Sequence, residues 1–321
     1  MAIQEFDPQL VDQFESWVDD PEVDVVDKLW PEVHPHMAKR EVARRAALLT
    51  MASNADKAGM RGRCHLLLVG PPGTGKTEIR DWVRHHIPGA HGIGPKSSSA
   101  GLKGDASGGD LTPGALAMAH DGMICIEELD KFAKSERDAL YEAMSEGRYE
   151  INQGEIREVV QAEVRCIATC NGVEKFADAI VDRFDFVIEM DEYNEEETVE
   201  VSDSLFDSFV DGFVDGEIDR TKEVVPEYLR WIDPYEPGAT DAFRSKVKQM
   251  KNYLIQQEQM TGAIRKKQAW LRVAYTYAKL NKRDMSPDDF INAIDLLYPD
   301  EDFRRPLEAI RDDNPDKLWS S

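Results

Sequence analysis

The sequence predicts an α/β domain with a parallel sheet, followed by a helical lid domain. Short apolar strands alternate with helical stretches over about residues 64–190, and this alternation is typical of parallel α/β sheets. A glycine-rich loop joins the first of these strands to a helix. From about residue 198 to residue 297, apolar residues recur at helical spacing. We therefore expect a phosphate-binding core, with helices on both faces of its sheet, and a lid built from helices.

Four segments are expected along the chain. They are an N-terminal helical segment (1–45), the α/β domain (46–195), the helical lid (196–300) and a C-terminal tail (301–321). The strands of the α/β domain are short apolar runs bounded by polar residues. We expect them at residues 64–69, 123–127, 164–170 and 184–190.

The composition describes a folded and strongly acidic protein. Of its 321 residues 41% are hydrophobic, enough to bury a core. The net charge is −23, from 62 acidic and 39 basic side chains, which suits a polyanion mimic, a solubility surface or adaptation to salt. The acids are spread along the whole chain, which argues against a mimic or an interaction tail. Because salt screens self-repulsion, the composition favours a halophilic source.

The sequence predicts a cytoplasmic protein with no membrane partner. It contains no run of about 18 apolar residues, the minimum for a membrane-spanning helix. Its acidic first 20 residues lack the pattern of a signal peptide. Cys64, Cys125, Cys166 and Cys170 lie in or beside apolar runs and form no CxxC pair. We expect them to be buried thiols in a reducing compartment.

The glycine-rich loop matches the phosphate-binding motif GxxxxGK(S/T) in full. It lies after an apolar strand and before a helix, as this motif requires. Its backbone amides can surround the phosphates of ATP, Lys76 can reach the β- and γ-phosphates, and Thr77 can bind Mg²⁺. The predicted nucleotide-binding residues are Gly70, Pro71, Pro72, Gly73, Thr74, Gly75, Lys76 and Thr77.

Two carboxylates follow the second strand, in a pattern typical of a Walker B motif. In that role Glu127 would hold the Mg²⁺ ion together with Thr77, and Glu128 would polarise the attacking water. A buried strand that ends in an acidic turn is the simpler interpretation. The position of the pair downstream of the phosphate loop favours the functional one.

Two further polar residues follow or precede strands. Asn171 follows the third strand, where ligands of open α/β sheets lie, and could orient the water, although Asn171-Gly172 also makes a good turn. Arg183 precedes the fourth strand. From the residues alone it could equally pair with Asp182 or Asp185 on the surface.

An ordered set of motifs over about residues 27–297 resembles the motor core of archaeal minichromosome maintenance (MCM) helicases. These are AAA+ ATPases, and MoxR-like and magnesium-chelatase-like ATPases are near relatives. The stretch 261–297, with Arg265, resembles the sensor-2 helix of the family and the segment after that helix. The other matching segments are RGRCHLLLVG (61–70), SSAGL (98–102), GAL (114–116), DG (121–122), ELDK (128–131), EAM (142–144) and RFD (183–185), the last resembling its arginine-finger turn.

The resemblance implies a shared active site. Lys76, Thr77, Glu127, Glu128 and Asn171 would act on the nucleotide of their own subunit. Arg183 and Arg265 would reach the nucleotide of a neighbouring subunit, as arginine finger and sensor 2. This arrangement implies a homo-oligomeric ring with a hexamer as its expected size, because head-to-tail interfaces must close or continue as a filament.

The sequence departs from the family pattern at several points. Glu127 stands where the family has aspartate, and the insert between residues 102 and 116 is shorter than usual. A hairpin expected at residues 148–162 carries Gln153 where the family has a DNA-contacting lysine. We also expect no N-terminal DNA-binding domain with its oligonucleotide-binding and zinc-carrying parts, and no winged helix after the lid.

Two functions are compatible with these residues. The favoured one is a ring-forming DNA helicase or translocase. The alternative is a MoxR- or magnesium-chelatase-like ATPase that remodels proteins through a partner or loader. Gln153 favours the alternative, whereas the remaining motifs favour the DNA motor. For DNA the candidate contacts are Lys103, Arg148 and Arg157, and the simpler interpretation of all three is an ordinary solvated charge.

Overall fold

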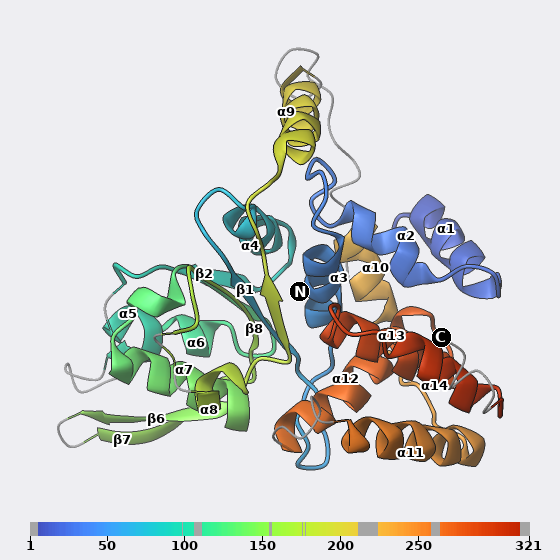
Figure 1. Ribbon diagram of the computed structural model, residues 1–321. Coiled ribbons are helices and arrows are strands. Elements are labelled where there is room, and N and C mark those ends of the chain that lie inside the picture. Colours follow the sequence, from blue (N-terminus) through green and yellow to red (C-terminus); the bar gives the residue numbers. More distant parts are fainter. Residues whose placement is uncertain are drawn as a thin grey trace. The chain divides into compact units, whose positions relative to one another are not determined.

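A computed structural model describes residues 6–97, 99–105, 111–153, 156–174, 176, 178–210, 224–257 and 264–314 (Figure 1). The chain divides into two compact units. One is Lys28–Leu229, and the other combines Met1–Asp27 with Arg230–Ser321. The division into four segments stays a prediction.

The first unit is built on a sheet of five parallel strands, in the order β2-β5-β8-β1-β9. Every residue of β1 and β5 is buried, as expected of strands covered on both faces. The α/β prediction is therefore confirmed. The strands are β1 (His65–Val69), β2 (Ala90–Ile93), β5 (Met123–Ile126), β8 (Arg165–Cys170) and β9 (Phe186–Glu189).

Strand β2 was not predicted. Its sequence, Ala-His-Gly-Ile, has neither an apolar run nor alternation, and it lies at the edge of the sheet with β5 as its neighbour. An edge strand buries less surface than a central one, so its composition carries a weaker signal.

Helices cover the sheet and position its loops. Helix α3 packs on β1, β8 and β9, and helix α4 packs on β2, β5 and β8 (Figure 1). The helical elements of this unit, with α2 and α10 crossing its limits, are α2 (Val25–Leu29), η1 (Trp30–Glu32), α3 (Glu41–Ala52), α4 (Lys76–His86), α5 (Ser99–Lys103), α6 (Ala115–Met118), η2 (Leu129–Lys131), α7 (Lys134–Glu146), α8 (Asp178–Val181), α9 (Glu195–Phe209) and α10 (Val224–Ile232).

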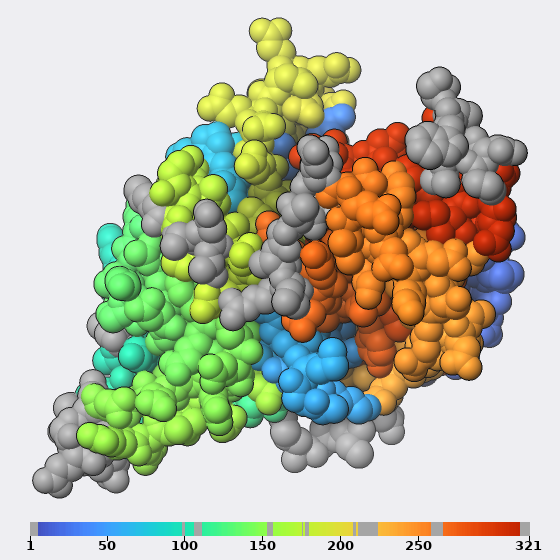
Figure 2. Space-filling model, turned by 60° about the horizontal axis from the view of Figure 1, so that its bottom comes forward, coloured from blue at the N-terminus to red at the C-terminus, as the bar shows by residue number. Residues whose placement is uncertain are grey.

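Two short antiparallel pairs lie outside the main sheet. The predicted hairpin is present as β6 (Arg148–Gln153) and β7 (Ile156–Gln161), and it projects from the rest of its unit (Figures 1 and 2). The shortened insert forms β3 (Gly104–Asp105) and β4 (Thr112–Pro113). Residues 106–110 of this insert lie outside the described part of the chain.

The second unit is built from helices, and it includes residues 230–300 of the expected lid. Its core contains the fully buried Trp270, whose indole nitrogen donates a hydrogen bond to the hydroxyl of Tyr298 at 3.0 Å. Helix α14 lies within the predicted tail, so helical structure continues past residue 297. The helices are α1 (Pro8–Asp19), α11 (Asp241–Gln256), α12 (Ile264–Leu280), α13 (Pro287–Leu297) and α14 (Arg304–Arg311). No helix in the described ranges is long and apolar enough to cross a membrane.

The four cysteines are buried in the first unit. Burial raises the pKa of Cys125 and of Cys170 to about 12. Both groups are therefore neutral thiols at neutral pH, as expected for cysteines that act as small core residues.

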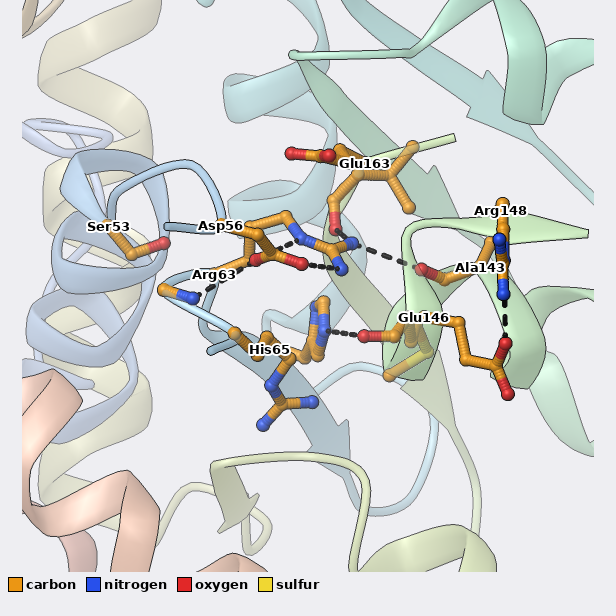
Figure 3. Close-up of polar contacts among 12 residues, drawn as sticks. Ser53, Asp56, Arg63, His65, Ala143, Glu146, Arg148 and Glu163 are labelled. Atoms are coloured by element: carbon orange, nitrogen blue, oxygen red, sulfur yellow. Dashed lines mark hydrogen bonds and ion pairs between the residues drawn. The ribbon is translucent and has the colours of Figure 1, made fainter. Parts of the chain in front are cut away.

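A buried polar cluster joins β1 to the end of helix α7 (Figure 3). Arg63, which is 1% exposed, donates hydrogen bonds to both carboxylate oxygens of Asp56 at 2.9 and 2.8 Å. It also donates to the carbonyl oxygens of Ala143 and Val164. His65 lies within 3.1 Å of the carbonyl oxygen of Met144. Two side chains thus contact carbonyls in the last turn of α7, and the Ala143 carbonyl also accepts a hydrogen bond from the amide of Gly147.

This cluster predicts a stability effect. Burial disfavours the Asp56 carboxylate, but its hydrogen bonds and its charge pairing with Arg63 outweigh burial and lower the Asp56 pKa. Asp56→Asn would leave the buried Arg63 charge unpaired and should lower the free energy of unfolding by about 3 kcal/mol. Because a lowered carboxylate pKa stabilises the fold above the unfolded value, the difference from wild type should shrink below about pH 4.

Chemical denaturation across a pH series measures this effect. The matched control is Glu41→Gln, which removes the exposed pair between Glu41 and Arg45 on helix α3. Such a pair contributes about 0.3–0.5 kcal/mol. An Asp56→Asn loss no larger than that of the control would contradict a stabilising role for the cluster.

Candidate active site

The phosphate loop connects β1 to helix α4, and its backbone requires glycine. Gly70, Gly73 and Gly75 have φ angles of 150°, 84° and 92°. A side chain at Gly70 would also place its β-carbon 2.2 Å from the carbonyl oxygen of Met190. Only glycine adopts this succession of conformations without strain. The loop can therefore turn its amides toward an anion at the start of α4.

Lys76 lies inside this loop. It is 6% exposed, and its ammonium donates hydrogen bonds to the carbonyl oxygens of Gly70 and Pro71 at 2.7 and 2.5 Å. Burial lowers the pKa of Lys76. Thr77 is exposed in the first turn of α4. A buried ammonium, glycine-rich backbone and an exposed hydroxyl together fit a polyphosphate and its cation.

Both carboxylates lie at the carboxyl end of β5. Glu127 is 41% exposed, and its Oε2 lies 3.2 Å from Nη1 of Arg80. Glu128 has a left-handed backbone with φ 50°, and its amide donates a hydrogen bond to the hydroxyl of Thr169 at 3.1 Å. Its carboxylate pairs with Lys131. A cavity of about 430 Å³ is lined by Gly94, Pro95, Lys96, Ser97, Glu127 and Glu128.

Asn171 lies at the same edge of the sheet. It is exposed and directly follows β8, which pairs with β1 on one side and with β5 on the other. Because parallel strands end at one edge, Asn171 is located between the phosphate loop and the carboxylates. The arrangement suits nucleotide hydrolysis.

Arg183 lies at the opposite edge of the sheet. It precedes β9, whose Phe186 pairs with Leu66 near the start of β1. Its Nε donates a hydrogen bond to the hydroxyl of Ser145 at 3.1 Å, and its guanidinium is 5.4 Å from the ring centroid of Tyr141. The length of β1 separates Arg183 from the phosphate loop of its own chain. The side chain of Arg265 lies outside the described residues.

Several contacts of the site were not predicted from the sequence. Arg40 donates a hydrogen bond from Nε to the carbonyl oxygen of Thr74 in the phosphate loop, and its guanidinium lies 3.9 Å from the ring centroid of Tyr193. Arg80 and Thr169 contact the two glutamates. No local pattern marks these residues, because each contact joins distant parts of the chain.

The predicted Mg²⁺ ligands fit a cation held mainly by the nucleotide. No three His, Cys, Asp or Glu side chains converge on a metal site in the part of the chain that is described. Mg²⁺ commonly binds through one or two protein oxygens, water and substrate phosphates. The exposed Thr77 hydroxyl and the part-exposed Glu127 carboxylate are oxygen ligands of the required type.

The sequence is similar to known proteins over most of its length. The family model of the MCM P-loop domain matches residues 12–209. DNA replication licensing factor mcm6 of Schizosaccharomyces pombe is 24% identical over 84% of this chain and 33% of its own length. MCM3 of Gallus gallus is 28% identical over 54% of the chain and 24% of its own length. The mcm5 protein of Dictyostelium discoideum is 33% identical over 41% of the chain and 18% of its own length.

This chain therefore spans a third or less of the length of these relatives. The family match covers more than half of the chain and includes the phosphate loop, both carboxylates, Asn171 and Arg183. Together with the order of the sheet, the match assigns the chain: it belongs to the MCM family and carries the P-loop domain of that family.

Proposed function

We propose that this chain is an ATP-hydrolysing MCM-type motor subunit that works in a ring on DNA. The main support is the distribution of the site residues over two edges of one sheet. Lys76, Glu128 and Asn171 lie at the carboxyl edge, and Arg183 lies at the amino edge. The relatives are named as DNA replication licensing factors, which supports DNA as the substrate.

In this proposal each residue has a separate task. Lys76 binds and orients the β- and γ-phosphates, and Thr77 with Glu127 holds Mg²⁺, which supplies charge neutralisation at the phosphates. Glu128 accepts the proton of the attacking water, and Asn171 orients that water. For this step Glu128 must exchange its contact with Lys131 for one with water.

Arg183 would act in trans. A residue at the amino edge cannot approach the phosphate loop of its own chain, but a head-to-tail neighbour can bring its Arg183 to that loop. Such interfaces generate closed rings, and we propose a homo-hexamer. In NTPases an arginine supplied in this way raises turnover by about 10³–10⁵.

The first test concerns hydrolysis. Lys76→Ala should abolish most nucleotide binding, whereas Glu128→Gln should bind ATP and lose about 10²–10⁴-fold in turnover. Binding of a fluorescent ATP analogue and phosphate release measure the two effects. Glu146→Gln is the control, because this exposed glutamate ends helix α7 and pairs with Arg148. Wild-type turnover by Glu128→Gln would contradict its role as base.

A second test concerns the shared site. Arg183→Ala and Lys76→Ala subunits should each be nearly inactive. Mixed in equal amounts they should regain turnover, because an intact phosphate loop can then face an intact Arg183. Phosphate release by the mixture measures this, with size-exclusion chromatography to verify that mixed rings form. Mixed rings without recovered activity would contradict action in trans.

The projecting hairpin is the element that separates the DNA motor from the protein-remodelling alternative. Arg148 and Arg157 are exposed on its strands, but Arg148 pairs with Glu146, and Glu150 and Glu158 are exposed beside them. With a net charge of −23, binding cannot rest on overall attraction to phosphates. This acidic setting, with Gln153 at the tip, supports a MoxR- or chelatase-like ATPase as the second candidate.

The third test measures DNA binding. In the DNA motor, Gln153→Lys should strengthen binding and Arg157→Ala should weaken it, because each changes one cation on the hairpin. Fluorescence anisotropy of labelled single- and double-stranded DNA, with a non-hydrolysable ATP analogue in low and high salt, measures the affinity. Arg244→Ala, an exposed arginine of helix α11, is the control. If neither the wild type nor any variant binds DNA in any of these conditions, the protein-remodelling function is favoured.

A further inference from the structure

We infer that Arg80 is a positioning residue that competes with the cation for the Glu127 carboxylate, so that Arg80 raises the Mg²⁺ concentration that the site requires. This inference rests on the proposed function, because it concerns the same nucleotide site. It also gives a physical reason why position 127 holds glutamate where the family has aspartate.

Arg80 is built into the core beneath the site. It lies on helix α4, about one turn after Lys76, and is 5% exposed. One terminal nitrogen lies 3.2 Å from Oε2 of Glu127, and the other donates a hydrogen bond to Asp81 at 2.7 Å. Its Nε is buried and has no hydrogen-bond partner among the residues that the structure describes. A buried guanidinium with an unsatisfied donor depends strongly on the partners it has.

The contact requires the longer acid. An aspartate at position 127 would withdraw the carboxylate by about one carbon–carbon bond, roughly 1.5 Å. Its oxygen would then lie beyond the distance of about 4 Å at which an ion pair is counted. Glu127 reaches Arg80 because glutamate has one methylene more than aspartate.

The pair also reduces the negative charge that the Glu127 carboxylate presents to a cation. Arg80 lies against Oε2 and neutralises part of the carboxylate charge, while the Glu127 side chain as a whole remains 41% exposed and open to a cation. A cation bound by Glu127 and Thr77 would have to share this carboxylate with a guanidinium. The guanidinium and the cation are both positive, and they repel each other when they share one carboxylate. Arg80 therefore lowers the affinity of Glu127 for the cation.

The experiment compares Arg80→Met with Arg84→Met. Arg84 is the matched control, because it lies one turn further along α4 and its side chain rests against Gly92. Binding of a fluorescent ATP analogue is measured in EDTA and across a Mg²⁺ titration. Arg80→Met should lower the midpoint Mg²⁺ concentration at least fivefold and leave the affinity in EDTA within twofold. Arg84→Met should match the wild type.

A double-mutant cycle without nucleotide tests the pair itself. Arg80→Met and Glu127→Gln should each lower the melting temperature, and the double variant should lose clearly less than their sum. Glu127→Asp should also lower the melting temperature, because it breaks the same contact. Additive losses would overturn the pair as a coupled unit.

The two proposals fail in different ways. A wild-type chain that binds nucleotide, together with an Arg80→Met midpoint that is unchanged or raised, overturns the role of Arg80 alone. A wild-type chain that binds no nucleotide in EDTA or in Mg²⁺ overturns the proposed function, whatever the cycle reports about the pair.

Discussion

Strand β8 is hydrogen-bonded in parallel to β1 on one side and to β5 on the other, and the site depends on this pairing. The register sets Val69 opposite Cys170 and Ile126 opposite Ala168. Three loops with different chemistry therefore begin at one edge. The same parallel direction sends Arg183, which precedes β9, to the other edge. One rule of strand direction thus separates Lys76, Glu128 and Asn171 from Arg183, and the proposed division into groups that act on the chain's own nucleotide and a group that acts on a neighbour's follows this separation.

Each charged group of the site is held by an internal partner. Lys76 donates to loop carbonyls, Glu127 pairs with Arg80, and Glu128 pairs with Lys131. Groups paired in this way are kept in place without a ligand, and the two buried cations among them, Lys76 and Arg80, have polar partners. In the proposed function, each of these groups must exchange its internal partner for the nucleotide, the cation or water, so the strength of the internal contacts would help to set the affinity for nucleotide and cation.

The sequence predicted the features that depend on residues close to one another in the chain. The phosphate motif, four of the five sheet strands and the hairpin follow from short-range patterns, and the structure alters their ends by one or two residues. Edge strand β2 has no such pattern. Arg40 directly precedes α3 and Arg80 lies within α4, and both contact the site. The residues next to them in the sequence give no sign of these contacts. Contacts between distant segments are set by packing, which a periodicity does not encode.

The left-handed backbone of Glu128 has a consequence for how the site could be lost. For a residue with a side chain this conformation is unfavourable by about 1–2 kcal/mol, and here the amide is held by the hydroxyl of Thr169 on the neighbouring strand. Valine has nearly the same shape as threonine and would fill the same buried space without that hydroxyl. In the proposed function, this one hydroxyl helps to hold the backbone turn that carries the candidate base Glu128. Its removal would change the placement of that carboxylate without changing any charge of the chain.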